Sequence, residues 1–273
     1  MCFYFRQSKD ALAVANRFKA KFREDIPDST LGISSGQSLS LNNSNVNSLF
    51  EAVNSQNTKT GSLFEKVESP NVNENSLFEF VNSSQVNANI SSLNVNGSST
   101  FEMVNGFSHP KCPVITDSEP GFIDSYTWGL IPSFAIDSDI QKHTLNARIE
   151  TIDSKPSFRN SIGNRCLVIA DGFYEWKEVS LNGKKFKHKY LIAMPDEQLF
   201  AFAGLYSFWN DRTSGNICKT FTILTTEANS VVAAIHSKNR MPVILKQNEE
   251  SLWLEGAPHT LFANRATLEL VAN

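Results

Sequence analysis

From about residue 100 onward, apolar residues come in short runs that polar turn sequences separate. Five of these runs are RCLVIADGFYEW, KYLIAM, LFAFAGLYSFW, TFTILTT and MPVIL. Their length and their content of Val, Ile, Phe, Tyr and Leu are typical of strands. The segments LNGKK and WNDRTSGN are interpreted as hairpin connections, and residues 196–199 as a turn. Because strands dominate without alternating with helices, the pattern predicts an α+β fold with one mainly antiparallel, curled or barrel-like sheet and few helices.

Two segments have helical patterns instead. In residues 9–24, KDALAVANRFKAKFRE, the apolar positions Leu12, Val14, Ala15, Phe18 and Phe22 recur at helical spacing. This segment is predicted to be an amphipathic helix that follows a short N-terminal strand. Residues 226–237, TEANSVVAAIHS, are predicted to form a second helix, which carries a histidine near its C-terminal end.

Between these patterned parts lies a stretch dominated by Asn and Ser. It divides the chain into a domain of residues 1–28 and 100–273 and an insertion of residues 29–99. NSLFEAVNS, GSLFEKVES and NSLFEFVNS recur within it at a step of 14 residues, and STFEMVNGF is a weaker copy. A unit this short and polar has little apolar surface to offset its ordering entropy. A flexible surface loop is therefore favoured for this segment over a small stacked array of the repeats. The phenylalanines Phe50, Phe64 and Phe78 could instead dock an unknown protein partner.

The composition narrows the functional classes. The chain has 273 residues, 41% of them hydrophobic, and a formal net charge of -3. Any nucleic-acid-binding surface is therefore expected to be a local patch. The four cysteines form no C-x-x-C pair and there is no Gly-rich phosphate loop, so neither a metal site nor a cofactor is predicted. No apolar run approaches the roughly 20 residues that span a bilayer, and no signal peptide is recognised. No membrane association is predicted, and the expected location is the cytoplasm.

Cys2 follows the initiator methionine directly. Once that methionine is removed, Cys2 carries a thiol and a free α-amine on adjacent carbons. This pair can trap an aldehyde as a five-membered ring. The alternative is a frayed terminus without function.

Polar residues also interrupt segments that otherwise look buried. In TLNARIET, Asn146 and Arg148 occupy alternate positions and would face one side of a strand. In ADGFYEWK, Glu175 lies among aromatic residues, where desolvation raises a carboxyl pKa into the range of a general acid or base. Each has a structural alternative: Asn146 could satisfy backbone groups, and Glu175 could pair with Lys177 or Arg148.

Three further residues belong to the same set of candidates. His236 ends an apolar stretch and Arg240 begins the next strand, while Trp128 precedes Pro132 in TWGLIPSF. A histidine at a helix end is commonly a partner of the helix dipole, and a tryptophan is commonly part of a core. Taken one at a time, these signals do not separate a catalytic site from a structural one.

Taken together, the motifs occur in one order. Cys2, WGLIP, NAR, KPSFR, RCLVIADGFYEWK, FAGL, TILTTEAN and RMPVIL follow one another along the chain. This succession resembles the SRAP family of SOS-response-associated peptidase domains, and the resemblance covers residues 1–26 and about 100–254. It implies removal of the methionine and attack of the terminal cysteine on the ring-opened abasic site of single-stranded DNA. The implied product is a thiazolidine DNA–protein crosslink in the DNA damage response, with abasic-site lyase activity as a side reaction. Association with the nucleoid when bound to DNA is also implied.

The resemblance also implies roles for the candidate residues. Cys2 would be the nucleophile, Asn146 would position it, Glu175 would be the general acid and base, and His236 would assist proton transfer. Arg148, Arg240 and Arg6 would contact the DNA backbone, and Trp128 would support the distorted strand. Family members often have Gly-Arg after the cysteine, whereas this chain has Phe3 and Tyr4, so one phosphate contact is in question.

Three other functions stay open on the sequence alone. The first is an N-terminal-nucleophile cysteine peptidase that processes itself or releases its own crosslink. The second is a single-strand-binding module with an inert Cys2. The third is a docking protein built on the SLFE repeats.

Overall fold

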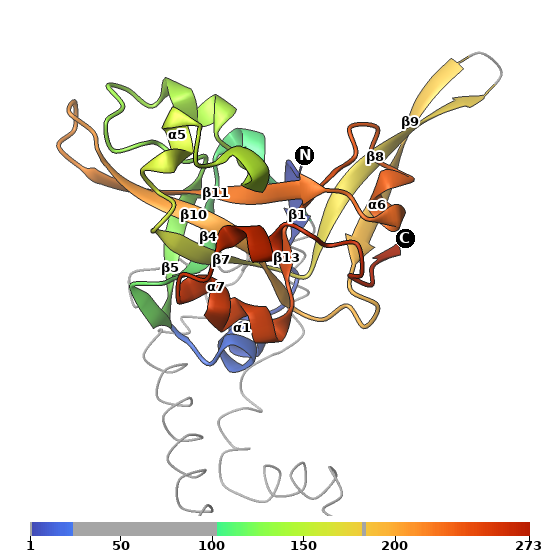
Figure 1. Ribbon diagram of the computed structural model, residues 1–273, viewed down its shortest axis with the longest axis horizontal. Coiled ribbons are helices and arrows are strands. Elements are labelled where there is room, and N and C mark those ends of the chain that lie inside the picture. Colours follow the sequence, from blue (N-terminus) through green and yellow to red (C-terminus); the bar gives the residue numbers. More distant parts are fainter. Residues whose placement is uncertain (1, 24–102, 182–183) are drawn as a thin grey trace, which may run out of the picture.

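A computed structural model describes residues 2–23, 103–181 and 184–273 (Figure 1). The predicted insertion of residues 29–99, its repeats and the proposed domain boundaries lie in the part outside these ranges.

The strands are β1 (Tyr4–Arg6), β2 (Lys21–Phe22), β3 (Val104–Asn105), β4 (Lys111–Thr116), β5 (Glu119–Trp128), β6 (Asn146–Arg148), β7 (Arg165–Ala170), β8 (Gly172–Leu181), β9 (Lys184–Ala193), β10 (Phe200–Asn210), β11 (Ile217–Glu227), β12 (Arg240–Pro242), β13 (Ile244–Leu245) and β14 (Val271–Ala272). The α-helices of the described ranges are α1 (Ala11–Phe18), α5 (Pro156–Arg159), α6 (Ser230–Ala233) and α7 (Gln247–Leu254).

Five strands close into a ring. β4 pairs antiparallel with β5 and β7, and β10 pairs antiparallel with β7 and β11. A short parallel pairing of β11 with β5, at Thr220–Thr127 and Phe221–Trp128, completes the circuit. The prediction of a mainly antiparallel, barrel-like α+β fold with few helices is confirmed.

A second sheet has the strand order β14-β9-β8-β1-β3, and it places the N-terminus in the middle of the fold. β1 pairs antiparallel with β8 through Phe5–Phe173 and with β3 through Phe5–Val104. The hairpin of β8 and β9 extends away from the barrel (Figure 1). Both sheets therefore border the segment that carries Cys2.

Two hydrophobic cores explain why the long apolar runs lack alternation. Phe200, Phe202 and Tyr206 on one face of β10 pack into the core that also contains Cys2 and Trp128. Ala201, Ala203 and Leu205 on its other face pack into a core covered by α1 and α7. A strand buried on both faces shows a continuous apolar run.

Two helix predictions were too long. α1 ends at Phe18, because Lys19 adopts a left-handed conformation with φ 51°, and residues 21–22 instead pair with β5. α6 covers only Ser230–Ala233, so His236 lies beyond its end. The run RCLVIADGFYEW contains two strands, which are separated at Asp171. Within the described ranges, no helix is long and apolar enough to cross a membrane.

Candidate active site

The side chains of Cys2, Asn146, Glu175 and His236 come together from four segments far apart in the sequence. Cys2 is fully buried in the core between the two sheets. Nδ2 of Asn146 donates a hydrogen bond of 2.7 Å to the carbonyl oxygen of Cys2. Burial raises the pKa of the Cys2 thiol well above its ordinary value, and the charge of Glu175 raises it further. These contacts join three of the four predicted catalytic residues.

Asn146 reaches Cys2 because β6 pairs in parallel with β11, with Asn146 opposite Ile223. Ala147 is buried between Asn146 and Arg148, so those two residues share the other face, as predicted. The side-chain oxygen Oδ1 of Asn146 is also buried and has no hydrogen-bond partner in the described residues. The amide thus presents an acceptor beside the cysteine as well as the donor that holds it.

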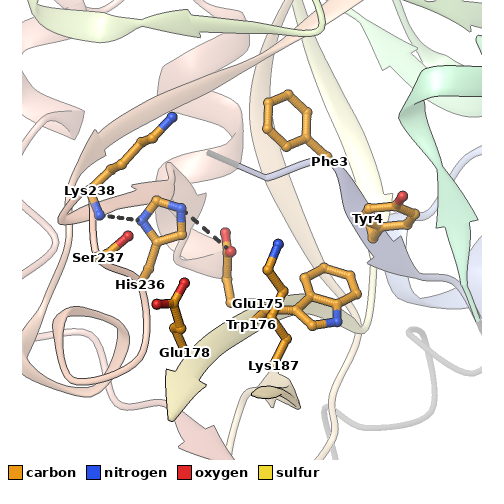
Figure 2. A pocket seen from close by; sticks show the side chains of 9 residues that line it. All are labelled: Phe3, Tyr4, Glu175, Trp176, Glu178, Lys187, His236, Ser237 and Lys238. Atoms are coloured by element: carbon orange, nitrogen blue, oxygen red, sulfur yellow. Dashed lines mark hydrogen bonds and ion pairs between the residues drawn. The ribbon is translucent and has the colours of Figure 1, made fainter. Parts of the chain in front are cut away.

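Glu175 and His236 form the second half of the site. Oε2 of Glu175 lies 3.6 Å from Nε2 of His236, and both side chains are largely buried (Figure 2). Desolvation raises the pKa of Glu175 to about 7 and lowers the pKa of His236 to about 4. At neutral pH the imidazole is therefore neutral and the carboxyl group is about half protonated.

The tautomer of His236 follows from its other ring nitrogen. The backbone N–H of Lys238 donates to Nδ1 of His236 at 3.3 Å, so Nδ1 is the acceptor and the ring proton resides on Nε2. This N–H is directed toward the carboxyl group of Glu175. The pair can shift a proton between a carboxyl group and a bound molecule at neutral pH, which is the property that acid–base catalysis requires.

A hollow of about 270 Å³ opens over this pair. Its floor is the β8–β9 hairpin, and its walls are the N-terminal segment and the loop after α6 (Figure 2). The lining residues are Phe3, Tyr4, Glu175, Trp176, Glu178, Lys187, His236, Ser237 and Lys238. Phe3 directly follows Cys2 in the chain, so the hollow adjoins the cysteine.

Aromatic rings form one end of this hollow. The rings of Phe3 and Phe107 lie 4.8 Å apart, and those of Tyr4 and Trp176 lie 4.9 Å apart. Phe107 is 56% exposed. The backbone N–H of Gly106 donates to the carbonyl oxygen of Phe3 at 2.9 Å. A Cβ on Gly106 would lie 2.9 Å from the Trp128 ring, so glycine is required there.

The sequence did not single out Phe107, Trp176, Lys187 or Lys238 as site residues. Trp176 is adjacent to Glu175 in the chain, so the sequence could have indicated it as a site residue. Lys187 and Lys238 reach the hollow only through strand pairing and loop packing, and Phe107 packs against Phe3 at its edge.

A second hollow of about 420 Å³ shares Lys238 with the first. Arg148 and Arg240 both line it. Arg148 is exposed and has no ion pair within the described ranges. Arg240, in contrast, makes a bidentate pair with Glu150, with distances of 2.9 and 2.8 Å, and donates to the carbonyl oxygen of Thr225 at 2.7 Å. Of the two arginines, Arg148 has the guanidinium that is available to an anion.

Two predicted DNA contacts have other partners in the structure. Trp128 is fully buried, and its Nε1–H donates to the carbonyl oxygen of Leu145 at 2.8 Å. The ring therefore holds the residue before Asn146 and presents no face to a ligand. Nε of Arg6 donates to Oδ1 of the fully buried Asp171 at 3.2 Å. The Arg6 guanidinium is thus engaged in anchoring β1.

The described residues contain no group of three His, Cys, Asp or Glu side chains that is placed to hold a metal ion. They place a proton-transfer pair and cations at the hollow, with the buried cysteine beside it. Such a set suits chemistry at a polar, anionic ligand that has a carbonyl group.

Comparisons with known proteins find a family and several relatives. Residues 65–270 match the family described as SOS response associated peptidase (SRAP). "Abasic site processing protein YoqW" of Bacillus subtilis (strain 168) is 43% identical over 142 residues, which are 52% of this chain and 61% of YoqW. "Abasic site processing protein HMCES" of Gallus gallus is 34% identical over 165 residues, which cover 52% of this chain and 47% of HMCES.

A solved structure extends the likeness to the fold. The crystal structure of a protein from Bacteroides thetaiotaomicron matches with a TM-score of 0.66 and 28% identity, and it covers 99% of this chain and 90% of that chain. The curated relatives are matched over only about half to three fifths of their own length.

Proposed function

The chain belongs to the SRAP family, and from that premise we propose that it processes abasic sites in single-stranded DNA by covalent capture through Cys2. The observation that carries this proposal is that Glu175 and His236 line one hollow, while Cys2, held by Asn146, is buried directly beside it, next to Phe3. The names of the relatives YoqW and HMCES support abasic-site processing. The covalent step is argued from the residues themselves.

Capture begins with the free α-amine of Cys2 after removal of the methionine. Such an amine has an ordinary pKa of about 7.7–8.0, so a useful fraction is neutral near pH 7. Its lone pair attacks C1′ of the ring-opened sugar, and the resulting carbinolamine loses water to form an imine. The raised pKa of the buried thiol supports this order, because the sulfur is protonated when the amine reacts.

Ring closure follows from the second group of the same residue. The thiol transfers its proton to the imine nitrogen and the sulfur bonds to C1′, which gives a thiazolidine. The net reaction joins one aldehyde and one aminothiol and releases one water molecule. No oxidant or reductant is needed.

Glu175 and His236 supply the proton transfers. Opening of the sugar requires removal of the proton from the 1′-hydroxyl group and protonation of the ring oxygen. A carboxyl group with a pKa of about 7 performs either transfer at neutral pH. Nε2 of the neutral imidazole lies 3.6 Å from that carboxyl group, and the dipole of its N–H stabilises the ionised form. Asn146 fixes the Cys2 backbone so that the amine meets the sugar in one orientation.

DNA lies across both hollows in this proposal. An abasic nucleotide has no base to unstack, so its sugar enters the first hollow at lower cost than an intact nucleotide. Arg148 and Lys238 hold phosphates on the side of the second hollow. The exposed ring of Phe107 stacks on a neighbouring base, in a role that stacking aromatics serve in single-strand binding.

The peptidase alternative is less well supported. A catalytic cysteine needs a lowered pKa so that the thiolate is populated. Here burial has the opposite effect on Cys2. Lyase activity is supported more specifically, because the same carboxyl group can remove a proton from C2′ once the imine has formed, which leads to strand cleavage by elimination.

A denaturing gel with abasic single-stranded DNA tests the proposal. We expect a shifted, covalent band with the wild-type protein and none with Cys2→Ala. Mass spectrometry of the intact protein checks that the methionine is absent. Reversible binding without a covalent band would refute capture. Self-cleavage of a version with extra residues before Cys2 would favour the peptidase instead.

A further inference from the structure

One face of the β8–β9 hairpin carries a row of lysines. In β9, Lys185, Lys187 and Lys189 occupy alternate positions, and all three are exposed. Alternate residues of a strand project from the same face and lie about 6.8 Å apart. The row therefore presents three cations in a line.

The strand register identifies which face this is. Trp176 is opposite Lys189, and Glu178 is opposite Lys187. Trp176, Glu178 and Lys187 all line the first hollow. Of the row, Lys187 thus lines the hollow, whereas Glu175 projects from the other face of β8 and enters the hollow around the strand edge. The row follows the hairpin, which extends away from the barrel (Figure 1).

The balance of charge on this face is positive. Its acidic side chain in the described part of the hairpin is Glu178, whose Oε1 lies 2.7 Å from Nζ of Lys185. Both groups are exposed, and such a pair contributes little and exchanges readily with other ions. Nζ of Lys189 lies 5.1 Å from the centre of the Tyr174 ring, within cation–π distance. The whole chain has a net charge of -3, so this patch is local.

We propose that this lysine face binds the phosphate backbone of single-stranded DNA that flanks the lesion. The inference rests on the proposed function, since it identifies the path of the DNA beyond the first hollow. Arg148 and Lys238 serve one flank, and the lysine row serves the other. The spacing of the lysines is comparable with that of phosphates in an extended single strand. The row begins at Trp176 and Tyr4, which together with Lys189 give the combination of stacking rings and cations that is typical of single-strand binding.

The hairpin itself offers a matched control. Lys177 and Lys184 lie on the same two strands but on the opposite face. The double variant Lys185→Gln with Lys189→Gln and the double variant Lys177→Gln with Lys184→Gln remove equal charge from the same hairpin. Only the first pair lies on the face of Trp176 and Glu178, whereas the second shares the face of Glu175. A reduced salt slope in the second pair alone would place the DNA on that face and overturn the inference.

Reversible binding is measured with a single-stranded oligonucleotide that contains a tetrahydrofuran abasic analogue, which has no aldehyde to capture. One probe has long flanks, and a second is trimmed to a dinucleotide on each side. On the long probe, we expect replacement of Lys185 and Lys189 to reduce the slope of log K against log salt by about 1.4, because two phosphates are no longer neutralised. The control pair should retain the wild-type slope, and the trimmed probe should bind all three proteins alike.

Equal slopes for the wild type and the Lys185 and Lys189 variant would overturn the inference. Equal weakening by the two double variants would also overturn it, because the effect would then come from overall charge. A third probe carries duplex flanks, and weakening by the Lys185 and Lys189 variant on that probe but not on the long single-stranded probe would refute the assignment to a single strand. Covalent capture by the wild-type protein is assayed separately with an aldehyde-bearing abasic site. Failure there would refute the proposed function without altering the comparison of the two faces.

Discussion

The side-chain amide of Asn146 holds the backbone of Cys2 across 144 positions of sequence, with 2.7 Å between Nδ2 and the carbonyl oxygen. The contact restrains a terminal segment that would otherwise fray. It therefore links the rate of the proposed capture to one hydrogen bond.

Replacement of Asn146 by Asp tests that link. The substitution retains size but replaces the donor with an oxygen that repels the Cys2 carbonyl. We expect the crosslinking rate to fall at least about tenfold, which corresponds to roughly 1.4 kcal/mol and to one good hydrogen bond. Binding of the tetrahydrofuran probe should stay unchanged. The exposed Asn216→Asp is the control, and an unaltered rate in Asn146→Asp would contradict the positioning role.

Glu175 and His236 make the free energy of unfolding depend on pH in opposite directions. The folded-state pKa of Glu175 is raised from 4.5 to about 7, so its ionisation destabilises the fold as pH rises through that range. The folded-state pKa of His236 is lowered from 6.5 to about 4, so its protonation destabilises the fold as pH falls through that range. The two effects partly cancel between about pH 4.5 and 6.5.

In Glu175→Gln, the pH dependence of the free energy of unfolding should therefore come from His236 without the opposing contribution of Glu175. We expect its free energy of unfolding to rise with pH up to about 6.5 and then level off. Between pH 4.5 and 7, the free energy of unfolding of Glu175→Gln should rise by on the order of 3 kcal/mol relative to that of the wild type. Denaturant titrations at several pH values measure this. His236→Gln should show the reverse slope, and parallel pH profiles for both variants and the wild type would contradict the assigned shifts.

Trp128→Phe should separate support of the site from contact with DNA. The variant removes one of two donors to the carbonyl oxygen of Leu145, which still accepts from the N–H of Ile223 at 3.2 Å, so the lost hydrogen bond is expected to cost about 1 kcal/mol of stability. Because Leu145 precedes Asn146, crosslinking should slow while affinity for the tetrahydrofuran probe is retained. Trp209→Phe removes a similar 2.8 Å bond to Ala135 far from the site and should leave the crosslinking rate unchanged. Reduced affinity for the tetrahydrofuran probe in Trp128→Phe but not in Trp209→Phe would favour direct contact of Trp128 with DNA.

Arg6→Gln should lower stability rather than DNA binding. The variant leaves the fully buried Asp171 without its guanidinium partner, and breaking such a pair from one side typically costs about 3–5 kcal/mol. The expected result is a large fall in the denaturant midpoint, with the salt slope of DNA binding unaltered. Lys142→Gln, which removes an exposed pair with Asp139, is the control and should leave the midpoint unchanged. A reduced salt slope in Arg6→Gln would restore the predicted phosphate contact.

Arg148 and Arg240 should behave differently although both line the second hollow. Arg148→Gln is expected to reduce the salt slope of binding by about 0.7, because one phosphate is no longer neutralised, without change in stability. Arg240→Gln breaks the bidentate pair with Glu150 and should lower the free energy of unfolding. Salt titrations and denaturant curves on the two variants check both halves. Equal salt slopes for wild type and Arg148→Gln would remove Arg148 from the DNA path.

Much of the architecture could be predicted from local patterns. Apolar, β-branched and aromatic runs indicate strands such as β10 and β11, and WNDRTSGN indicates the turn between them. The helix over residues 9–24 was overextended because a helical period continues to Phe22, whereas the left-handed Lys19 and pairing with β5 end the helix earlier. The spacing of apolar residues indicates which face of a segment is buried, but it does not indicate which other segment packs against that face.

The sequence by itself determined the strand-rich α+β class, the resemblance to the SRAP family, and Cys2, Asn146, Glu175 and His236 as candidates. Only the tertiary structure decided their partners. It joined Asn146 to Cys2 and His236 to Glu175, engaged Arg6 with Asp171, buried Trp128 and aligned the lysines of β9 with the hollow. The physical reason is that side-chain chemistry is local, whereas each of these contacts depends on strand register and loop packing between segments far apart in the chain.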